Sequence, residues 1–381
     1  MEPHLDSRAP EVPPDEGHGN GLGGGRREVT IPEFKREHDL SWILMGDRGL
    51  RAGWSALLAI ALYWLVTPVL DTIAVTAYPR LGDGVFSPFI VLISEFIPVV
   101  AILAIGVVMV HIEHRRIVDY NLADPRWLRH FAGGIAAGFA ALSVLVAALA
   151  GGGWIHFGHA ALSSGQALEY GSVWACAFLL VGLFEEGSFR CYLLFTLTRG
   201  INFWWALATV GSLCLLLLGS HNPKGSTGVF VIALLGAIPC WLVHRTDAKN
   251  SSFWQASWAT STAFGYFHTG NNGENAVGIF AAAFIGFAFC VSVRVTGSAW
   301  WAIGCHAAWD WAETYFYGTP DSGFVAQRHF LTTTPTGNTL WSGGTDGPEG
   351  SLLVAPVILL LLGILLAVYG RKREAVAAAF P

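Results

Sequence analysis

Three charged residues stand inside a long apolar stretch of this chain, which runs from about residue 171 to 197. They are Glu185, Glu186 and Arg190, in the segment EEGSFR. An ionised group is costly in the hydrocarbon core of a membrane, so three of them in one span indicate a functional site. Glu186 and Arg190 are four residues apart on a helix and can neutralise each other. The side chain of Glu185 points about 100° away from that of Glu186, so this pairing leaves Glu185 unexplained.

Two further polar motifs follow downstream. The segment FGYFHTG places Phe264 and His268 four residues apart, and the segment WAIGCHAAWDW does the same for His306 and Asp310. A single histidine in an apolar helix is more often a hydrogen-bonded core residue than a catalytic one. Together with Glu185, however, two imidazoles and a second carboxylate from three helices can activate a water molecule and stabilise an oxyanion, or can hold a metal.

The elements that must position these residues are membrane-spanning helices. The chain is 53% hydrophobic and 13% charged, against roughly 25% charged residues in a soluble domain. Its net charge of −5 is small and scattered, which argues against a nucleic-acid partner. Hydropathy predicts an all-α, polytopic transmembrane helical bundle of about 8–10 helices, each span close to the roughly 20 residues that the lipid bilayer requires. The predicted spans are 52–75, 88–111, 130–150, 171–197, 203–220, 228–244, 253–270, 276–293, 298–316 and 351–370.

The chain divides into a polar tail and a membrane domain. Residues 1–40 are rich in Pro, Gly and charged residues, which predicts a disordered cytoplasmic tail. Residues 41–375 form the membrane domain, and the polar motifs fall within about 165–316. If the spans alternate in direction, most Lys and Arg residues between them lie on one side. The positive-inside rule then places both termini in the cytoplasm and the connection 318–350 outside.

The order of the motifs, EExxxR, FxxxH and HxxxD, resembles that of the CAAX protease and bacteriocin-processing (CPBP, or Abi) family of intramembrane endopeptidases. The segment TGSAWWAIGCHAAWDW is also similar to the family's approach to its last histidine. The resemblance covers roughly residues 165–316. It implies a CAAX-type membrane endopeptidase, a bacterial cytoplasmic membrane as its location, and a peptide or protein substrate. A prenylated tail, a bacteriocin leader and a loop of a membrane protein all remain open as substrates.

Carried over residue by residue, the resemblance also implies roles. Glu185 would be the general base that activates the attacking water near the cytoplasmic face, and His268 would help to bind that water. His306 and Asp310 would stabilise the oxyanion or orient the site. The supporting residues would be Glu186, Arg190 and Phe264.

The resemblance leaves the use of a metal open. Glu185, His268 and His306 match a catalytic zinc site in number and would make this a metalloprotease, but the HExxH signature of soluble metalloproteases is absent. About seventy residues separate Arg190 from Phe264, which is enough for the additional pair of spans at 203–220 and 228–244. Because this pair is even in number, it leaves the sidedness of the later spans unchanged.

Two other classes of protein also fit the polar cluster. One is a non-catalytic membrane scaffold or bacteriocin-immunity factor that keeps the cluster for structure or for binding a partner. The other is a proton- or cation-coupled transporter, which predicts paired repeats with broken helices; the likeness between FWWALAT at 203 and FWQASWAT at 253 is faint.

The predicted depths of the site residues in the membrane do not agree. If each helix starts where its predicted span starts, Glu185 and His306 lie near the cytoplasmic face, while His268 lies farther out. A helix that begins nearer Trp258 than Phe253, or one that re-enters at the Gly and Asn cluster after it, would bring His268 closer to the other two residues. The motif therefore favours a correction of this kind.

Overall fold

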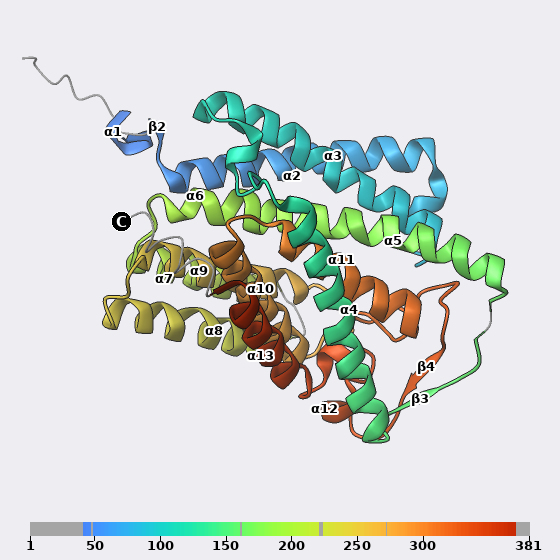
Figure 1. Ribbon diagram of the computed structural model, residues 1–381. Helices are drawn as coiled ribbons and strands as arrows, with labels where there is room; N and C mark the ends of the chain where they lie inside the picture. Colours follow the sequence, from blue (N-terminus) through green and yellow to red (C-terminus); the bar gives the residue numbers. More distant parts are fainter. Residues whose placement is uncertain (1–40, 47–48, 161, 221–223, 272, 371–381) are drawn as a thin grey trace, which may run out of the picture. The chain divides into compact units, whose positions relative to one another are not determined.

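The computed structural model of this chain describes residues 41–370, apart from 47–48, 161, 221–223 and 272 (Figure 1). The predicted tail at 1–40 lies outside the described residues. The described part is a bundle of helices, and the predicted all-α polytopic fold is confirmed. The longer helices are α2 (Ala52–Ala77), α3 (Pro88–Glu113), α4 (Trp127–Gly151), α5 (Ser164–Glu186), α7 (Phe203–Gly219), α8 (Gly225–Arg245), α9 (Ser251–His268), α10 (Ala276–Thr296), α11 (Trp300–Asp310) and α13 (Val354–Leu365).

Three of these helices continue through wider, π-type turns. The longest continuation follows α5, which passes through a π segment into α6 without a break in direction. The π segments and α6 are η3 (Gly187–Leu193), α6 (Leu194–Thr198), η4 (Trp311–Tyr317) after α11, and η6 (Leu366–Gly370) after α13. The remaining short elements are α1 (Ser41–Leu44), α12 (Thr339–Ser342), the 3₁₀ turns η1 (Pro79–Asp83), η2 (Ile117–Asp119) and η5 (Pro348–Gly350), and the strands β1 (Met45–Gly46), β2 (Gly49–Leu50), β3 (Ile155–Phe157) and β4 (Thr333–Pro335).

Each predicted span contains a helix, although the helices differ in how apolar they are. Among the described residues, six are long and apolar enough to cross a membrane: α2, α3, α4, the continuous α5–α6, α8 and α10. The helices α7 and α13 are shorter. Helix α9 is more polar because its buried face carries hydroxyl groups, such as those of Thr260 and Thr262, which donate to backbone carbonyls four residues earlier at 2.8 and 2.7 Å. Since each hydroxyl is satisfied within its own helix, α9 can lie inside the bundle.

The connections between helices gather at two ends, as alternating spans require. At one end Arg199 donates to the carboxylate of Glu113 at 3.1 Å and to the carbonyl oxygen of Leu50 at 3.2 Å. At the same end the indole of Trp300 donates to the carbonyl oxygen of Leu122 at 3.0 Å. We call this the arginine-rich end, and it is formed by the connections 114–126, 199–202 and 297–299.

The opposite end is closed by the connections 78–87, 152–163, 269–275 and 318–353, and we call it the strand end. Here β3 pairs antiparallel with β4, which joins the connection after α4 to the one after η4 (Figure 1). The long connection also reaches the other two, because the backbone N–H of Gln327 donates to Phe86 at 2.9 Å and that of Gly273 donates to Ser322 at 3.2 Å. These contacts agree with the predicted alternation of the spans.

Helices α4 and α11 approach each other so closely that their backbones touch. A Cβ atom added to Gly134 or to Gly138 would stand 2.1 Å from a carbonyl oxygen of α11, and one added to Gly304 would stand 2.3 Å from a carbonyl oxygen of α4. Small residues four apart allow such an approach between membrane helices. Helix α11, which carries His306 and Asp310, therefore packs against α4 through close backbone contacts at these glycines.

This contact predicts that alanine substitutions at two glycines of α4 differ strongly in their effect on the stability of the protein. We expect Gly138→Ala to lower the thermal stability of the purified protein by about 1–3 kcal/mol, since the added methyl meets the backbone of Cys305. The matched control is Gly151→Ala at the end of α4, where an added Cβ has no neighbour within 4 Å. Thermal unfolding in detergent compares the two variants. Equal stability would contradict the backbone contact.

Candidate active site

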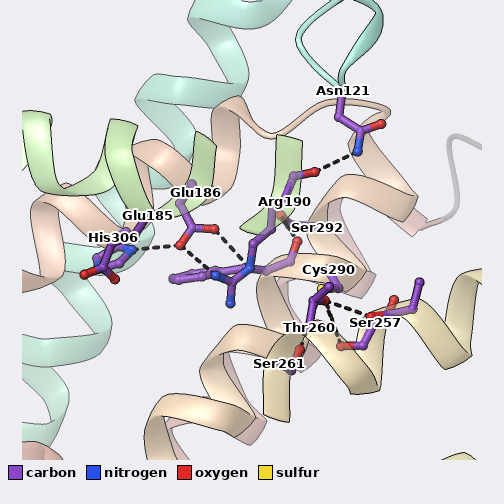
Figure 2. Close-up of polar contacts among 12 residues, drawn as sticks. Asn121, Glu185, Glu186, Arg190, Ser257, Thr260, Ser261, Cys290, Ser292 and His306 are labelled. Atoms are coloured by element: carbon purple, nitrogen blue, oxygen red, sulfur yellow. Dashed lines mark hydrogen bonds and ion pairs between the residues drawn. The ribbon is translucent and has the colours of Figure 1, made fainter. Parts of the chain in front are cut away.

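Glu186 and Arg190 form a buried ion pair, as their spacing predicts. Their side chains are 0% and 1% exposed, and the guanidinium Nη1 and Nε atoms lie 3.2 and 3.1 Å from the two carboxylate oxygens. Glu186 also accepts a hydrogen bond from Nδ1 of His306 at 2.8 Å, so it lies between the arginine and the imidazole (Figure 2). Because Nδ1 donates to Glu186, the other ring nitrogen of His306 is directed away from the pair.

Three aromatic rings also contact the guanidinium group of Arg190. Its guanidinium carbon lies 4.5, 5.4 and 5.6 Å from the ring centres of Phe264, Phe289 and Phe189. Such contacts attract a cation to the ring faces and are strongest where water is excluded. Phe264 therefore packs directly against the arginine of the ion pair.

The second ring nitrogen of His306 faces two further carboxylates. Its Nε2 atom lies 3.6 Å from Oε2 of Glu185 and 3.5 Å from Oδ2 of Asp310. The side chains of Glu185, His306 and Asp310 are 25%, 11% and 16% exposed, so they border open space rather than packed core. Oε2 of Glu185 accepts no hydrogen bond from any residue in the described ranges. This oxygen is free to accept one from a water molecule.

A cavity of about 180 Å³ brings the four predicted catalytic residues together. His268 reaches it from the last turn of α9, where its Nδ1 atom lies 2.9 Å from the carbonyl oxygen of Phe264. A carbonyl only accepts hydrogen bonds, so Nδ1 carries the proton and Nε2 is left for a ligand. The other lining residues are Phe86, Val91, Glu95, Phe178, Val181, Phe264, Asn271, Ala282, Ile285, Phe289, Trp309, Asp321, Ser322, Phe324 and Glu349.

The position of His268 corrects one expectation. Helix α9 begins at Ser251, so the later start near Trp258 is wrong. His268 nevertheless lines the same cavity as Glu185 and His306. The cavity thus extends from these two residues to the end of α9, and no shift of the helix is needed.

The cavity is bordered by the strand end of the bundle. Its lining residues outside the long helices, which include Phe86, Asn271 and Asp321, come from the connections 78–87, 269–275 and 318–353. None of its lining residues comes from the connections of the arginine-rich end as the structure describes them. The site therefore faces the end where β3 and β4 pair.

Several acidic residues of the cavity were not predicted. Glu95 is the one charged residue in the apolar span 88–111. A single charge in such a span could have marked it as a candidate site residue from the sequence alone. Asp321 and Glu349 belong to the connection 318–353, whose irregular sequence gives no pattern that would place them. Burial raises the pKa of Asp321 and of Glu349, and the nearby charge of Asp321 adds to the effect on Glu349.

Asn121 supports the site from the arginine-rich end. Its side-chain amide donates to the carbonyl oxygen of Arg190 at 2.7 Å, within the π segment (Figure 2). Its own carbonyl oxygen accepts from the backbone N–H of Ala299 at 2.8 Å, directly before α11. Asn121 has a positive φ of 55°, which asparagine tolerates better than most residues. It thus ties the helix of Glu185 to the helix of His306, and no sequence motif indicated it.

The predicted zinc ligands do not form a metal site in this geometry. Within the described residues, no three His, Cys, Asp or Glu side chains are grouped closely enough to hold a metal ion. Nδ1 of His306 is bonded to Glu186 and Nδ1 of His268 to a backbone carbonyl, while Glu185 faces His306 at 3.6 Å. Glu185, His268 and His306 have the residue types of a zinc site and share a cavity, but as the structure describes them they are not grouped closely enough to bind one ion.

Comparison with known protein families agrees with the motifs. Residues 168–251 and 247–312 match the family described as type II CAAX prenyl endopeptidase Rce1-like, which confirms the resemblance seen in the sequence. The matched residues are less than half of the chain and include every motif residue. No curated protein and no solved structure matches. Together with its six long apolar helices, the match identifies an integral membrane protein.

Proposed function

Since residues 168–312 form an Rce1-like region, we propose that this protein is an intramembrane endopeptidase that hydrolyses peptide bonds with a water activated by Glu185. The observation that carries the proposal is Oε2 of Glu185, which accepts no hydrogen bond from the described residues and faces Nε2 of His306 at 3.6 Å in a cavity shared with His268 and Asp310. A scaffold or immunity factor would need the buried Glu186–Arg190 pair, but not a carboxylate oxygen without a hydrogen-bond donor in a cavity that holds two imidazoles.

The proposed reaction uses only groups that border the cavity. Glu185 takes a proton from water, and the oxygen of that water adds to the carbonyl carbon of the peptide bond. His268 accepts a hydrogen bond from the attacking water through its unprotonated Nε2 atom, and His306, protonated on both ring nitrogens, donates one through Nε2 to the oxyanion that forms. When the carbon–nitrogen bond breaks, Glu185 returns its proton to the leaving nitrogen, so that a carboxylic acid and an amine result.

The supporting residues fix the geometry of this reaction. Glu186 holds the ring of His306 through Nδ1, and Asp310 lies beside Nε2, so the imidazole can carry a proton between two carboxylates. Arg190 pairs with Glu186 at 3.1 Å and holds that carboxylate in place. No step of the reaction is assigned to a metal.

The side of approach differs from the expectation drawn from the sequence. Under the positive-inside rule the arginine-rich end and both termini are cytoplasmic. The cavity is bordered by the strand end. In place of cleavage near the cytoplasmic face, we therefore propose that the substrate approaches from the strand end, which is the outer side in this orientation.

The proposal is tested by the cleavage of internally quenched peptides by the purified protein in detergent. We expect His268→Ala to reduce the rate of cleavage by at least a factor of about 100, the low end of what an acid or base group contributes. The control is His159→Ala, because His159 is exposed in the connection that follows β3. If His268→Ala cleaves as fast as His159→Ala, the assigned site is wrong.

A further inference from the structure

Helix α10 has no side chain at the point where it passes the guanidinium group of Arg190. A Cβ atom added to Gly286 would stand 2.5 Å from Nη2 of Arg190, which is closer than two non-bonded atoms approach in proteins. The same Cβ atom would stand 3.4 Å from Cδ1 of Phe264 and 3.6 Å from Cα of Ser261, both on α9. Gly286 therefore leaves the space that the guanidinium group occupies between α9 and α10.

The guanidinium group has little freedom to leave this space. Arg190 is fully buried, and its Nη1 and Nε atoms lie 3.2 and 3.1 Å from the two carboxylate oxygens of Glu186. Three aromatic rings pack around it, with centres 4.5–5.6 Å from the guanidinium carbon. On a protein surface the end of an arginine side chain would swing aside for a methyl group, but here each such movement disturbs the ion pair or the ring contacts.

A displaced guanidinium group would also disturb the imidazole of His306. The group is planar and rigid, so a methyl group that displaces Nη2 displaces Nη1 and Nε as well. Glu186, which these two atoms hold, accepts the hydrogen bond from Nδ1 of His306 at 2.8 Å (Figure 2). Phe289, three residues after Gly286, stacks on the ring of His306 with the two ring centres 5.7 Å apart. A side chain at position 286 would therefore reach His306 through Arg190 and Glu186.

We infer that Gly286 is a positioning residue for the reaction, because its lack of a side chain sets the place of the Arg190 guanidinium group and, through Glu186, the orientation of His306. This inference rests on the proposed endopeptidase function. A methyl group at Gly138 meets a backbone carbonyl, whereas one at Gly286 meets the end of a side chain. Substitution of Gly286 should therefore impair catalysis more than stability.

The first test measures cleavage and thermal unfolding of Gly286→Ala. We expect kcat to fall at least about tenfold, because a small misplacement of a catalytic group is costly. We expect KM to stay within about twofold, since Gly286 does not line the cavity. The melting temperature should stay within about 4 °C of the wild type, because alanine is the better helix former and the contact is with a side-chain end.

The control for this variant is Gly363→Ala on α13, where an added Cβ has no neighbour within 4 Å. It should cleave and unfold like the wild type. If Gly286→Ala cleaves as fast as Gly363→Ala, the inference is overturned.

The second test asks whether the effect passes through Arg190. Arg190→Lys keeps the positive charge but removes the Nη2 atom that the added methyl group meets, and by itself it should lower kcat, since an ammonium group cannot hold both oxygens of Glu186 in one fixed geometry. On this background Gly286→Ala should lower kcat by less than about twofold further. Two losses that multiply would show independent effects and overturn the inference.

The same double variant decides the case in which Gly286→Ala alone yields no folded protein. The inference then requires that Gly286→Ala combined with Arg190→Lys is recovered in folded form, because the atom that the methyl group meets is gone. A double variant that also fails to fold would overturn the inference.

A spectroscopic measurement distinguishes failure of the inference from failure of the proposed function. NMR of isotope-labelled histidine in detergent reports the Nδ1–H group of His306, and His306→Ala identifies its signal. We expect the carboxylate of Glu186 to shift this signal downfield in the wild type, and Gly286→Ala, but not Gly363→Ala, to move it upfield. A signal that does not move would contradict the inference alone. Absence of cleavage of every peptide by the wild type would contradict the endopeptidase proposal alone.

Discussion

Glu185→Gln is expected to reduce peptide cleavage by a factor of about 10⁴, the upper end of the range for acid–base groups, because Glu185 both takes and returns the proton. The amide keeps the shape of the side chain, so the protein should still insert and unfold at the same temperature. The measurement is initial cleavage rate, with thermal unfolding of the same sample.

The control for this variant lies on the same helix. Glu169 is exposed near the start of α5 and does not line the cavity, so Glu169→Gln should cleave like the wild type. Residual activity of Glu185→Gln above a tenth of the wild-type rate would remove Glu185 from the role of general base.

Arg190→Ala is expected to destabilise the protein by about 3–5 kcal/mol, because it leaves the carboxylate of Glu186 buried without its partner. The three aromatic rings around the guanidinium lose their contacts as well. The measurement is thermal unfolding in detergent. Arg245→Ala is the control, since Arg245 is exposed at the end of α8.

A double variant separates stability from catalysis. Glu186→Leu combined with Arg190→Leu removes both charges and should recover most of the lost stability, since a buried ion pair is often replaceable by apolar residues. It should not recover cleavage, because His306 then lacks the acceptor for its Nδ1 proton. If the double variant cleaves at the wild-type rate, Glu186 does not orient His306.

Much of the fold could be predicted because each helix that crosses a lipid bilayer needs an apolar span of roughly 20 residues, which hydropathy detects. The predicted span 203–220 corresponds to α7 (Phe203–Gly219), and the span 276–293 corresponds to α10 (Ala276–Thr296). The predicted span 253–270 likewise corresponds to α9 (Ser251–His268), although Ser and Thr on its buried face lower its hydropathy. The later start near Trp258, which the expected depth of His268 favoured, was wrong. In such a helix the backbone satisfies the hydroxyl groups, so hydropathy underestimates how deeply it is buried.

The candidate site was predictable only where charge stood out against an apolar background. Glu185, Glu186 and Arg190 could be recognised in this way, and Glu95 carried the same signal without a neighbour to support it. Asp321 and Glu349 could not be placed, because a connection such as 318–353 has no periodicity that ties it to one wall of a cavity. The role of Asn121 depends on a side-chain contact between segments 69 residues apart, which no local pattern reveals.

The close contact of α4 with α11 bears on whether the matched residues 168–312 could be studied as a separate fragment. The Rce1-like match begins at residue 168, after α4 has ended at Gly151. Yet α4 supplies Gly134 and Gly138, the groove in which the helix of His306 rests. A fragment cut at the limits of sequence similarity would carry every motif residue and lack the surface that holds one of them. In this protein the segment that matches the family is therefore shorter than the set of helices that positions its site residues.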